Sequence, residues 1–202
     1  MLPSARTTAI VAALSTLALT VPAAGIAKPN SSSLTSWRSL AAPRAASSVK
    51  TGAAPRARVT AALESQVLTG LNGVRAQHGL KALRKSSALA SAAYAHSVQM
   101  AKGGYFSHSS ANGEAFWKRI RRFYKQASFR YWAVGENLLW SSPNVDASGA
   151  IEMWMNSPEH RANMLDRDWR EVGLAAVHVT VAPGAFQGLE VTIVTADFGV
   201  RR

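Results

Sequence analysis

The hydrophobic period changes once along this chain, from a helical spacing to a strand-like alternation. Leu63, Val67 and Leu71 recur every four residues, and this spacing predicts an amphipathic helix. The ranges 172–181 and 189–198 are instead rich in alternating Val, Thr and Leu, and the Pro and Gly residues between them predict a β-hairpin with a longish loop. Helices followed by paired strands indicate an α+β sandwich with a small antiparallel sheet.

The segments between these two ends fit the same outline. The first helix is expected to end near His78, because Gly79 follows it. A strand is expected over 131–139, where aromatic and apolar residues surround Gly135-Glu136-Asn137. Further helices are predicted over the ranges 86–102, 114–123, 147–156 and 158–165.

The amino-terminal part of the chain has the pattern of an exported protein. Residues 1–27 combine a positive start, a short apolar run and small residues, so we predict a secretory signal cleaved near Ala24 or Ala27 and a secreted protein. Residues 28–60, rich in Ser, Ala, Pro and Arg, are interpreted as a flexible basic linker, and residues 61–202 as the folded domain. No later segment is long and apolar enough to span a bilayer, so no transmembrane segment is expected in the mature chain.

The chain is strongly basic and contains no cysteine. It has 23 Lys and Arg against 11 Asp and Glu, a formal net charge of +12 that favours anionic partners such as cell-envelope polymers or phospholipid headgroups. Nucleic acid is not expected as a partner, because no recognised nucleic-acid motif is present. Without cysteine, disulfides and thiolate metal sites are excluded, and core packing must hold the domain together.

One local cluster of basic residues is interleaved with aromatic residues. We interpret it as the solvated rim of a helix over a packed apolar side, with contact to an anionic envelope as a further hypothesis. Its members are Lys118, Arg119, Arg121, Arg122, Lys125 and Arg130.

Three short polar signatures carry the candidate chemistry. His108, Glu136 and His160 lie in segments about 25 residues apart, so they meet only if the fold brings them together. Two imidazoles and a carboxylate suit zinc or another divalent cation, and the same groups suit acid–base hydrolysis. Each residue taken alone is more simply a satisfied polar group that holds a loop to the core.

The sequence around His160 favours a neutral imidazole. Ser157 suits the cap of a helix and Pro158 its first position, which places His160 in the first turn. The positive end of the helix dipole there disfavours the imidazolium form, and both a metal ligand and a general base require the neutral ring.

The order and spacing of these signatures resemble the CAP superfamily, named after cysteine-rich secretory proteins, antigen 5 and plant pathogenesis-related proteins. The similarity is to its bacterial SCP-like extracellular branch and covers about residues 64–199. The segments that carry it are Leu71-Asn72 to Arg75-Ala76, Gly79-Leu80, His96-Ser97, Met100-Ala101, Phe106-Ser107-His108, Gly135-Glu136-Asn137-Leu138, Trp154, Ser157-Pro158, His160-Arg161-Ala162-Asn163 and Val172-Gly173.

The resemblance implies an α-β-α sandwich with a central antiparallel sheet and an open cleft lined by two histidines and two acidic residues. His108, Glu136 and His160 match three of these four groups, which implies a divalent metal site such as one for Zn²⁺. The fourth, a glutamate, falls on Ser157 here, so Ser157 itself and Glu159, two positions away, are the two candidates for the fourth cleft residue.

Three functions follow as hypotheses. The first is a secreted, non-catalytic binding module with a divalent ion and a lipid, sterol or cell-envelope ligand in or near the cleft, as the resemblance implies. The second is a metal-assisted hydrolase, a peptidase or cell-wall hydrolase, although neither a Ser nucleophile elbow nor a His-Glu-x-x-His helix is present. The third is an envelope-associated protein that acts through its basic surface.

Overall fold

The computed structural model describes residues 58–202 of the 202-residue chain, and the predicted signal and most of the predicted linker lie outside this range. The elements follow in the order β1 (Arg58–Val59), α1 (Ala61–Gln77), β2 (Arg84–Lys85), α2 (Ser87–Gly103), α3 (Phe116–Phe123), β3 (Trp132–Ser141), α4 (Ala147–Met155), α5 (Pro158–Met164), β4 (Glu171–Val179), the 3₁₀ turn η1 (Gly184–Phe186) and β5 (Val191–Arg201).

A five-stranded sheet forms the centre of the domain. The strand order is β1-β4-β5-β3, and the short β2 pairs with β4 in parallel, while the other pairs are antiparallel. β3 and β5 pair along the whole of β3, with Glu136 opposite Asp197. Because β3 ends the strand order, its outer edge faces residues that come from outside the sheet.

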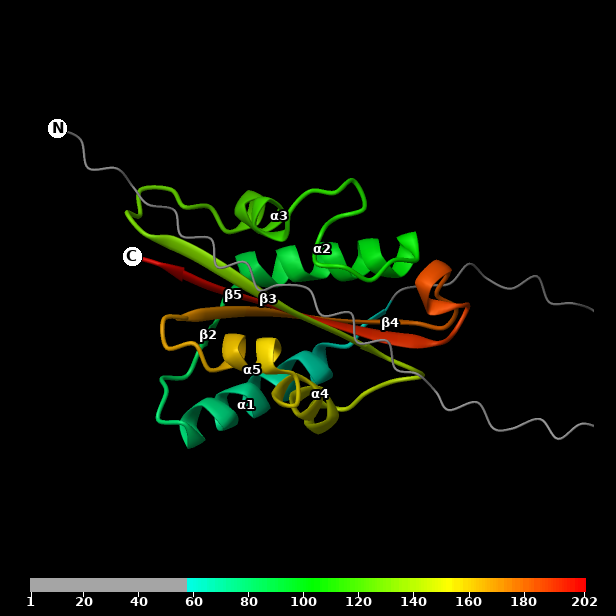
Figure 1. The fold of residues 1–202 in the computed structure, drawn as a ribbon, viewed down its shortest axis with the longest axis horizontal. Coiled ribbons are helices and arrows are strands. Elements are labelled where there is room, and N and C mark those ends of the chain that lie inside the picture. Colours follow the sequence, from blue (N-terminus) through cyan, green and yellow to red (C-terminus); the bar gives the residue numbers. More distant parts are fainter. Residues whose placement is uncertain (1–57) are drawn as a thin grey trace, which may run out of the picture. The chain divides into compact units, whose positions relative to one another are not determined.

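Helices cover both faces of the sheet, with α2 and α3 on one side and α1, α4 and α5 on the other (Figure 1). On the α1 side, Leu71 and Trp154 belong to one buried cluster with Phe198 of the sheet. On the α2 side, Leu89 and Ile120 belong to a cluster with Val134 of β3, and Met100 belongs to a cluster with Val177 of β4. The α-β-α sandwich with a central sheet is therefore confirmed.

Local sequence explains why these helices form and how they dock. Ser86 caps α2 by accepting a hydrogen bond from the Leu89 amide, and Gly104 ends the helix at a φ of 65°, a conformation that suits glycine. Gly173 of β4 lets α2 lie directly on the sheet, since a Cβ at this position would fall 2.0 Å from the Ala90 nitrogen. A helix is thereby held close to the strands that carry the polar signatures.

The predicted helices and strands are all present, with small shifts at their ends. α3 begins at Phe116 rather than at 114, because residues 110–114 form a turn in which the Ser110 amide donates to the Glu114 carbonyl at 2.9 Å. β1 and β2 were not predicted, since two residues carry no period, and β1 pairs Arg58 with His178 at the end of the predicted linker. No helix within residues 58–202 has the length and apolar character that crossing a membrane demands.

Candidate functional site

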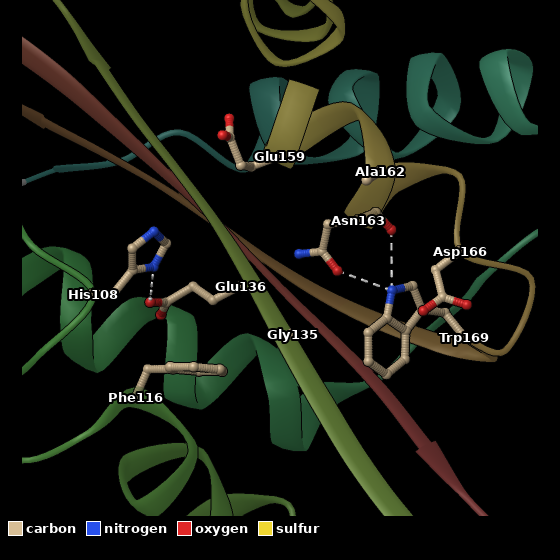
Figure 2. Close-up of a pocket in the computed structure, with 9 residues that line it drawn as sticks. All are labelled: His108, Phe116, Gly135, Glu136, Glu159, Ala162, Asn163, Asp166 and Trp169. Atoms are coloured by element: carbon tan, nitrogen blue, oxygen red, sulfur yellow. Dashed lines mark hydrogen bonds and ion pairs between the residues drawn. The ribbon is translucent and has the colours of Figure 1, made fainter. Parts of the chain in front are cut away.

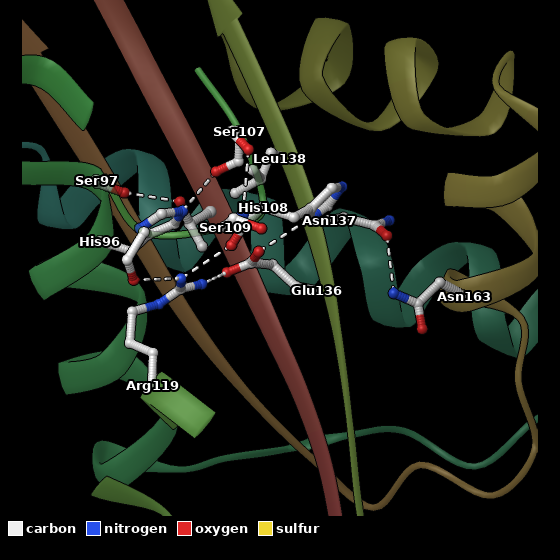
Figure 3. Close-up of polar contacts among 12 residues, drawn as sticks. His96, Ser97, Ser107, His108, Ser109, Arg119, Glu136, Asn137, Leu138 and Asn163 are labelled. Carbon is white, nitrogen blue, oxygen red and sulfur yellow. Dashed lines mark hydrogen bonds and ion pairs between the residues drawn. The ribbon is translucent and has the colours of Figure 1, made fainter. Parts of the chain in front are cut away.

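The Gly135-Glu136-Asn137 segment lies on β3, the edge strand, and its side chains alternate between the two helix layers. Glu136 points toward α2 and α3, where it meets Arg119. Gly135 and Asn137 point toward α5, where both approach Asn163. Figure 3 shows this division, with Arg119 and Asn163 on opposite sides of the strands. One tripeptide therefore connects both helix layers at the edge of the sheet.

Glu136 is buried and both of its oxygens are engaged. His108 donates its Nδ1 hydrogen to Oε1 at 2.8 Å, and the buried Arg119 guanidinium donates to Oε2. Burial by itself raises the pKa of Glu136, but the hydrogen bond from His108 and the positive charge of Arg119 outweigh it and hold the pKa below its usual value. Glu136 is thus a carboxylate with a fixed cationic partner.

The loop that carries His108 is held in place from two sides. His96 of α2 donates from Nε2 to the Ser107 carbonyl at 2.8 Å, and Arg119 donates to the His108 carbonyl at 2.9 Å. Burial lowers the pKa of His96 to about 4, so its ring is neutral at neutral pH. With Nδ1 of His108 committed to Glu136, the acceptor nitrogen of this ring is Nε2.

Asn137 and Asn163 attach α5 to the other side of β3. The Asn137 side chain donates to the His160 carbonyl at 3.0 Å and accepts from the Asn163 amide at 2.9 Å. The Trp169 indole in turn donates to the Asn163 backbone and side-chain oxygens, both at 3.0 Å. These bonds fix the first turn of α5 beside β3 and with it the position of His160.

α5 begins as its sequence predicts, and His160 lies in its first turn. Ser157 is the cap residue and Pro158 the first helical residue, although the Ser157 side chain makes no capping hydrogen bond. Burial lowers the pKa of His160, and the nearby positive charge that His108 can carry lowers it further. His108 is thus close enough to influence His160 electrostatically, and the neutral form of His160 is favoured.

A hollow of about 260 Å³ opens between the two helix layers over Gly135 and Glu136. Its lining, drawn in Figure 2, consists of His108, Phe116, Gly135, Glu136, Glu159, Ala162, Asn163, Asp166 and Trp169. Of the two candidates for the fourth group, Glu159 lines this hollow, and the Ser157 hydroxyl lies 3.4 Å from a Glu159 carboxylate oxygen. The hollow therefore has apolar walls with carboxylates at several points.

Of the three predicted metal ligands, His108 and Glu136 line the hollow, whereas His160 is not among its lining residues. Within residues 58–202, no three His, Asp or Glu side chains are grouped closely enough to hold an ion together. The oxygens of Glu136 are already engaged by His108 and Arg119, so this carboxylate fits the role of orienting the imidazole. Imidazole nitrogens, such as those of His108 and His160, are chemically suited to bind a divalent ion. The set of His108, Glu136 and His160 stays a prediction.

The sequence interpretation missed four residues that build this site, and one of them was assigned wrongly. Arg119 was placed in a solvated rim, but it is 1% exposed and lies inside the site. Its position three residues after Phe116 and next to Ile120, on the buried face of α3, was the signal available. Asn163 was noted only as the end of the His160-Arg161-Ala162-Asn163 signature. Asp197 and Trp169 carried no signal of their own, because their roles depend on strand pairing and on the path of α5.

The fold and the site define a class of domain: an α-β-α sandwich in which Glu136 of the edge strand β3 accepts a hydrogen bond from His108 of the loop between α2 and α3. The model of the "CAP: Cysteine-rich secretory protein family" matches residues 68–189. This match covers more than half of the chain, and the protein therefore belongs to the cysteine-rich secretory protein family.

Relatives and solved structures agree with this assignment. Two Bacillus subtilis proteins are similar: "Uncharacterized membrane protein YlbC", 32% identical over 111 residues (55% of this chain, 30% of that protein), and "Uncharacterized protein YkwD", 28% identical over 116 residues (57% and 43%). The chain thus spans less than half the length of either relative.

The solved structures show the same fold. An extracellular protein containing an SCP domain from Bacillus anthracis matches with a TM-score of 0.53 and 25% identity over 70% of this chain and 41% of that one. An outer surface protein from Borrelia burgdorferi matches with a TM-score of 0.57 and 17% identity over 73% of this chain and 99% of that one, which is evidence of fold alone.

Proposed function

We propose that this protein is a secreted, non-catalytic binding module whose cleft takes a small apolar group beside a divalent cation. The observation that carries the proposal is the Glu136 carboxylate, which is buried and bonded through both oxygens to His108 and Arg119. A carboxylate neutralised in this way, with a lowered pKa, is a weak base, and it serves to orient His108.

The hollow itself supports binding of part of a larger ligand. Its volume of about 260 Å³ lies just below the roughly 300–1,000 Å³ of pockets that enclose a drug-sized molecule. Phe116, Ala162 and Trp169 supply apolar walls, so the cleft suits a small apolar group or one end of a lipid or sterol. No Ser, Thr, Tyr, Cys or Lys side chain is among the residues that line this hollow, so its lining offers no hydroxyl, thiol or amine nucleophile.

His108 and His160 are the residues proposed to hold the cation. When bound, the ion supplies a positive centre that attracts a polar headgroup, and Glu136 keeps the His108 ring oriented by accepting its Nδ1 hydrogen. Lowering of the His160 pKa by burial keeps that ring in the form that binds metals. Export of the protein is part of this proposal, supported by the composition of residues 1–27 and by the extracellular SCP-domain protein of similar fold.

The proposal is tested by calorimetric titration of the full chain with ZnCl₂, followed by a fluorescent sterol and a fluorescent fatty acid as probes. The double variant His108→Ala/His160→Ala should show no heat of zinc binding, while the matched control His78→Ala/His178→Ala should show the same heat as the wild type. Zinc binding that is unchanged in the first variant would remove the cation from the proposal. The variant Trp169→Ala should weaken probe binding, and full retention of probe binding would remove the cleft as its site.

Hydrolysis is the second candidate, and one observation favours it. The His108–Glu136 pair, at 2.8 Å, resembles an imidazole oriented by a carboxylate to act as a general base through its free nitrogen. Release of products from peptidoglycan or peptide substrates by the wild type, abolished in His108→Ala, would establish this activity and overturn the non-catalytic assignment.

A further inference from the structure

The segment from α3 to the start of β3 is entirely without acidic residues. Between Ala115 and Gly135 the chain contains no Asp or Glu, whereas it contains Lys118, Arg119, Arg121, Arg122, Lys125 and Arg130. Among these only Arg119 is turned inward, where it binds Glu136. The remaining five cations are exposed, so one stretch of about 20 residues presents positive charge without local compensation.

Most of these cations have no anionic partner in the part of the chain that the structure describes. Arg122 forms an ion pair with Glu114 at 2.6 Å. Within residues 58–202, no ion pair within 4 Å involves the other four, which are Lys118, Arg121, Lys125 and Arg130. Their charges are therefore available to an external anion.

Exposed aromatic side chains accompany these charges. Phe123 at the end of α3 is 39% exposed, and Phe129 in the following loop is 40% exposed. They are two of the few large apolar side chains that the domain leaves in water, and both lie within the same cationic segment. Each side chain leaves about two fifths of its surface in water, and an apolar medium that covered this surface would stabilise the contact.

The carboxyl terminus extends the same surface. Arg202 exchanges both backbone hydrogen bonds with Tyr131, at 2.7 and 3.1 Å, and its guanidinium lies 4.6 Å from the Tyr131 ring centre. The Arg201 guanidinium lies 3.9 Å from the ring centre of Tyr124 and 5.2 Å from that of Phe129. In Figure 1 the carboxyl terminus accordingly lies beside the beginning of β3, on the side of the loop that leaves α3.

We infer that this surface, formed by the exposed side chains between residues 118 and 130, docks the protein on an anionic phospholipid bilayer. Basic residues are attracted to anionic headgroups, and aromatic side chains favour the boundary between headgroups and acyl chains. A soluble polyanion satisfies the cations equally well but gives Phe123 and Phe129 no apolar medium, so the exposed phenylalanines favour a membrane. The inference does not depend on the cleft ligand, because α3 directs Arg119 toward the cleft and these side chains toward solvent.

Vesicle co-sedimentation of the full chain tests the inference. Wild-type protein should bind phosphatidylcholine vesicles that contain phosphatidylglycerol, and binding should weaken as salt is raised. The variant Lys118→Gln/Arg121→Gln/Lys125→Gln/Arg130→Gln should lower the partition coefficient about 100-fold or more, since each basic residue at an anionic surface contributes about fivefold. The variant Phe123→Ser/Phe129→Ser should lower it about tenfold with an unchanged salt dependence.

A matched variant distinguishes the effect of this surface from the effect of the protein's net charge. Lys81→Gln/Lys85→Gln/Arg161→Gln/Arg167→Gln removes the same net charge from other exposed positions and should retain most of the binding. Equal loss in both quadruple variants, or wild-type binding by the first, would overturn the inference. The inference would also be overturned if the protein bound polyphosphate but not vesicles and if Phe123→Ser/Phe129→Ser left the binding of polyphosphate unchanged. Vesicles of pure phosphatidylcholine, which carry no net charge, measure any binding by the apolar amino-terminal run. The variant His108→Ala/His160→Ala, altered only at the proposed cation site, should bind anionic vesicles as the wild type does.

Discussion

Glu136 of β3 and Asp197 of β5 are direct partners across the sheet, and both carboxyl groups are buried. Burial first, and then the negative charge of Glu136, raise the pKa of Asp197 well above its usual value, while Arg119 acts in the opposite direction. Neither Asp197 oxygen has a hydrogen-bond partner within residues 58–202. The two carboxyl groups therefore titrate as one interacting pair, in which the pKa of Glu136 is lowered and that of Asp197 is raised.

Replacing Asp197 by Asn should stabilise the domain at neutral pH. Because the folded pKa of Asp197 lies above the unfolded value of about 3.9, its neutral form contributes fully below about pH 4, and this contribution is lost as the pH rises through the folded pKa. The side-chain amide of the Asp197→Asn variant is neutral at every pH, so we expect a gain of about 1–2 kcal/mol at pH 7 and little change near pH 4. Urea unfolding at both pH values measures this, and a loss of stability at pH 7 would contradict it.

His96 should cause the opposite pH dependence. Its folded pKa of about 4 lies below the unfolded value, so the unfolded chain binds more protons between about pH 6.5 and 4, and stability falls as the pH falls through this range. The loss approaches about 3 kcal/mol in the wild type. In His96→Gln, which retains a donor for the Ser107 carbonyl but does not titrate, this part of the pH dependence should disappear. An unchanged slope between pH 4 and 6.5 in urea unfolding would show that His96 is not its source.

Removing Arg119 should destabilise the domain through Glu136. The variant Arg119→Met leaves a buried carboxylate without its cationic partner, which costs about 3–5 kcal/mol. The double variant Arg119→Met/Glu136→Gln should recover a large part of this loss, because no buried charge is left unpaired. Thermal unfolding of the two variants makes the comparison, and equal instability of both would show that Arg119 acts through packing rather than charge.

Gly135 should tolerate no side chain. A Cβ there would lie 2.5 Å from Asn163 Oδ1 and 2.9 Å from Trp169, so Gly135→Ala should loosen the attachment of α5 and destabilise the domain by about 1–3 kcal/mol. Gly73→Ala in α1 is the matched control: its Cβ meets nothing within 4 Å, and it should stabilise by about 0.5–1 kcal/mol. Urea unfolding measures the change in stability, and tryptophan fluorescence reports any loosening around Trp169. Similar results for the two variants would contradict the close packing at Gly135.

The sequence predicted those parts of the fold in which apolar residues recur at a regular spacing or a capping residue marks the start of a helix. α1 and the paired β4 and β5 were recognised because their apolar residues recur, and α5 because Ser157 and Pro158 mark its start. β1 and β2 were not, since two-residue strands form only when a longer neighbour is already placed.

Site residues were predicted from the sequence only where the residue type by itself suggests a chemical role, as histidine and glutamate do. His108, Glu136 and His160 were expected to meet. His108 and Glu136 do, while the convergence of His160 with them stays a prediction. Asp197 was not singled out within the predicted strand 189–198, because its importance comes from the register that sets it opposite Glu136. Arg119 was misassigned because charge usually marks the solvated side of a helix, whereas here a buried carboxylate offsets its desolvation.

The most direct test of the cleft as a cation site is an NMR titration of the histidine ring nitrogens with Zn²⁺ at neutral pH. We expect the resonances of His108 and His160 to change together at one equivalent, while those of His78 and His178 stay in place. Absence of change at His108 and His160, or change confined to His78 and His178, would contradict the proposed site.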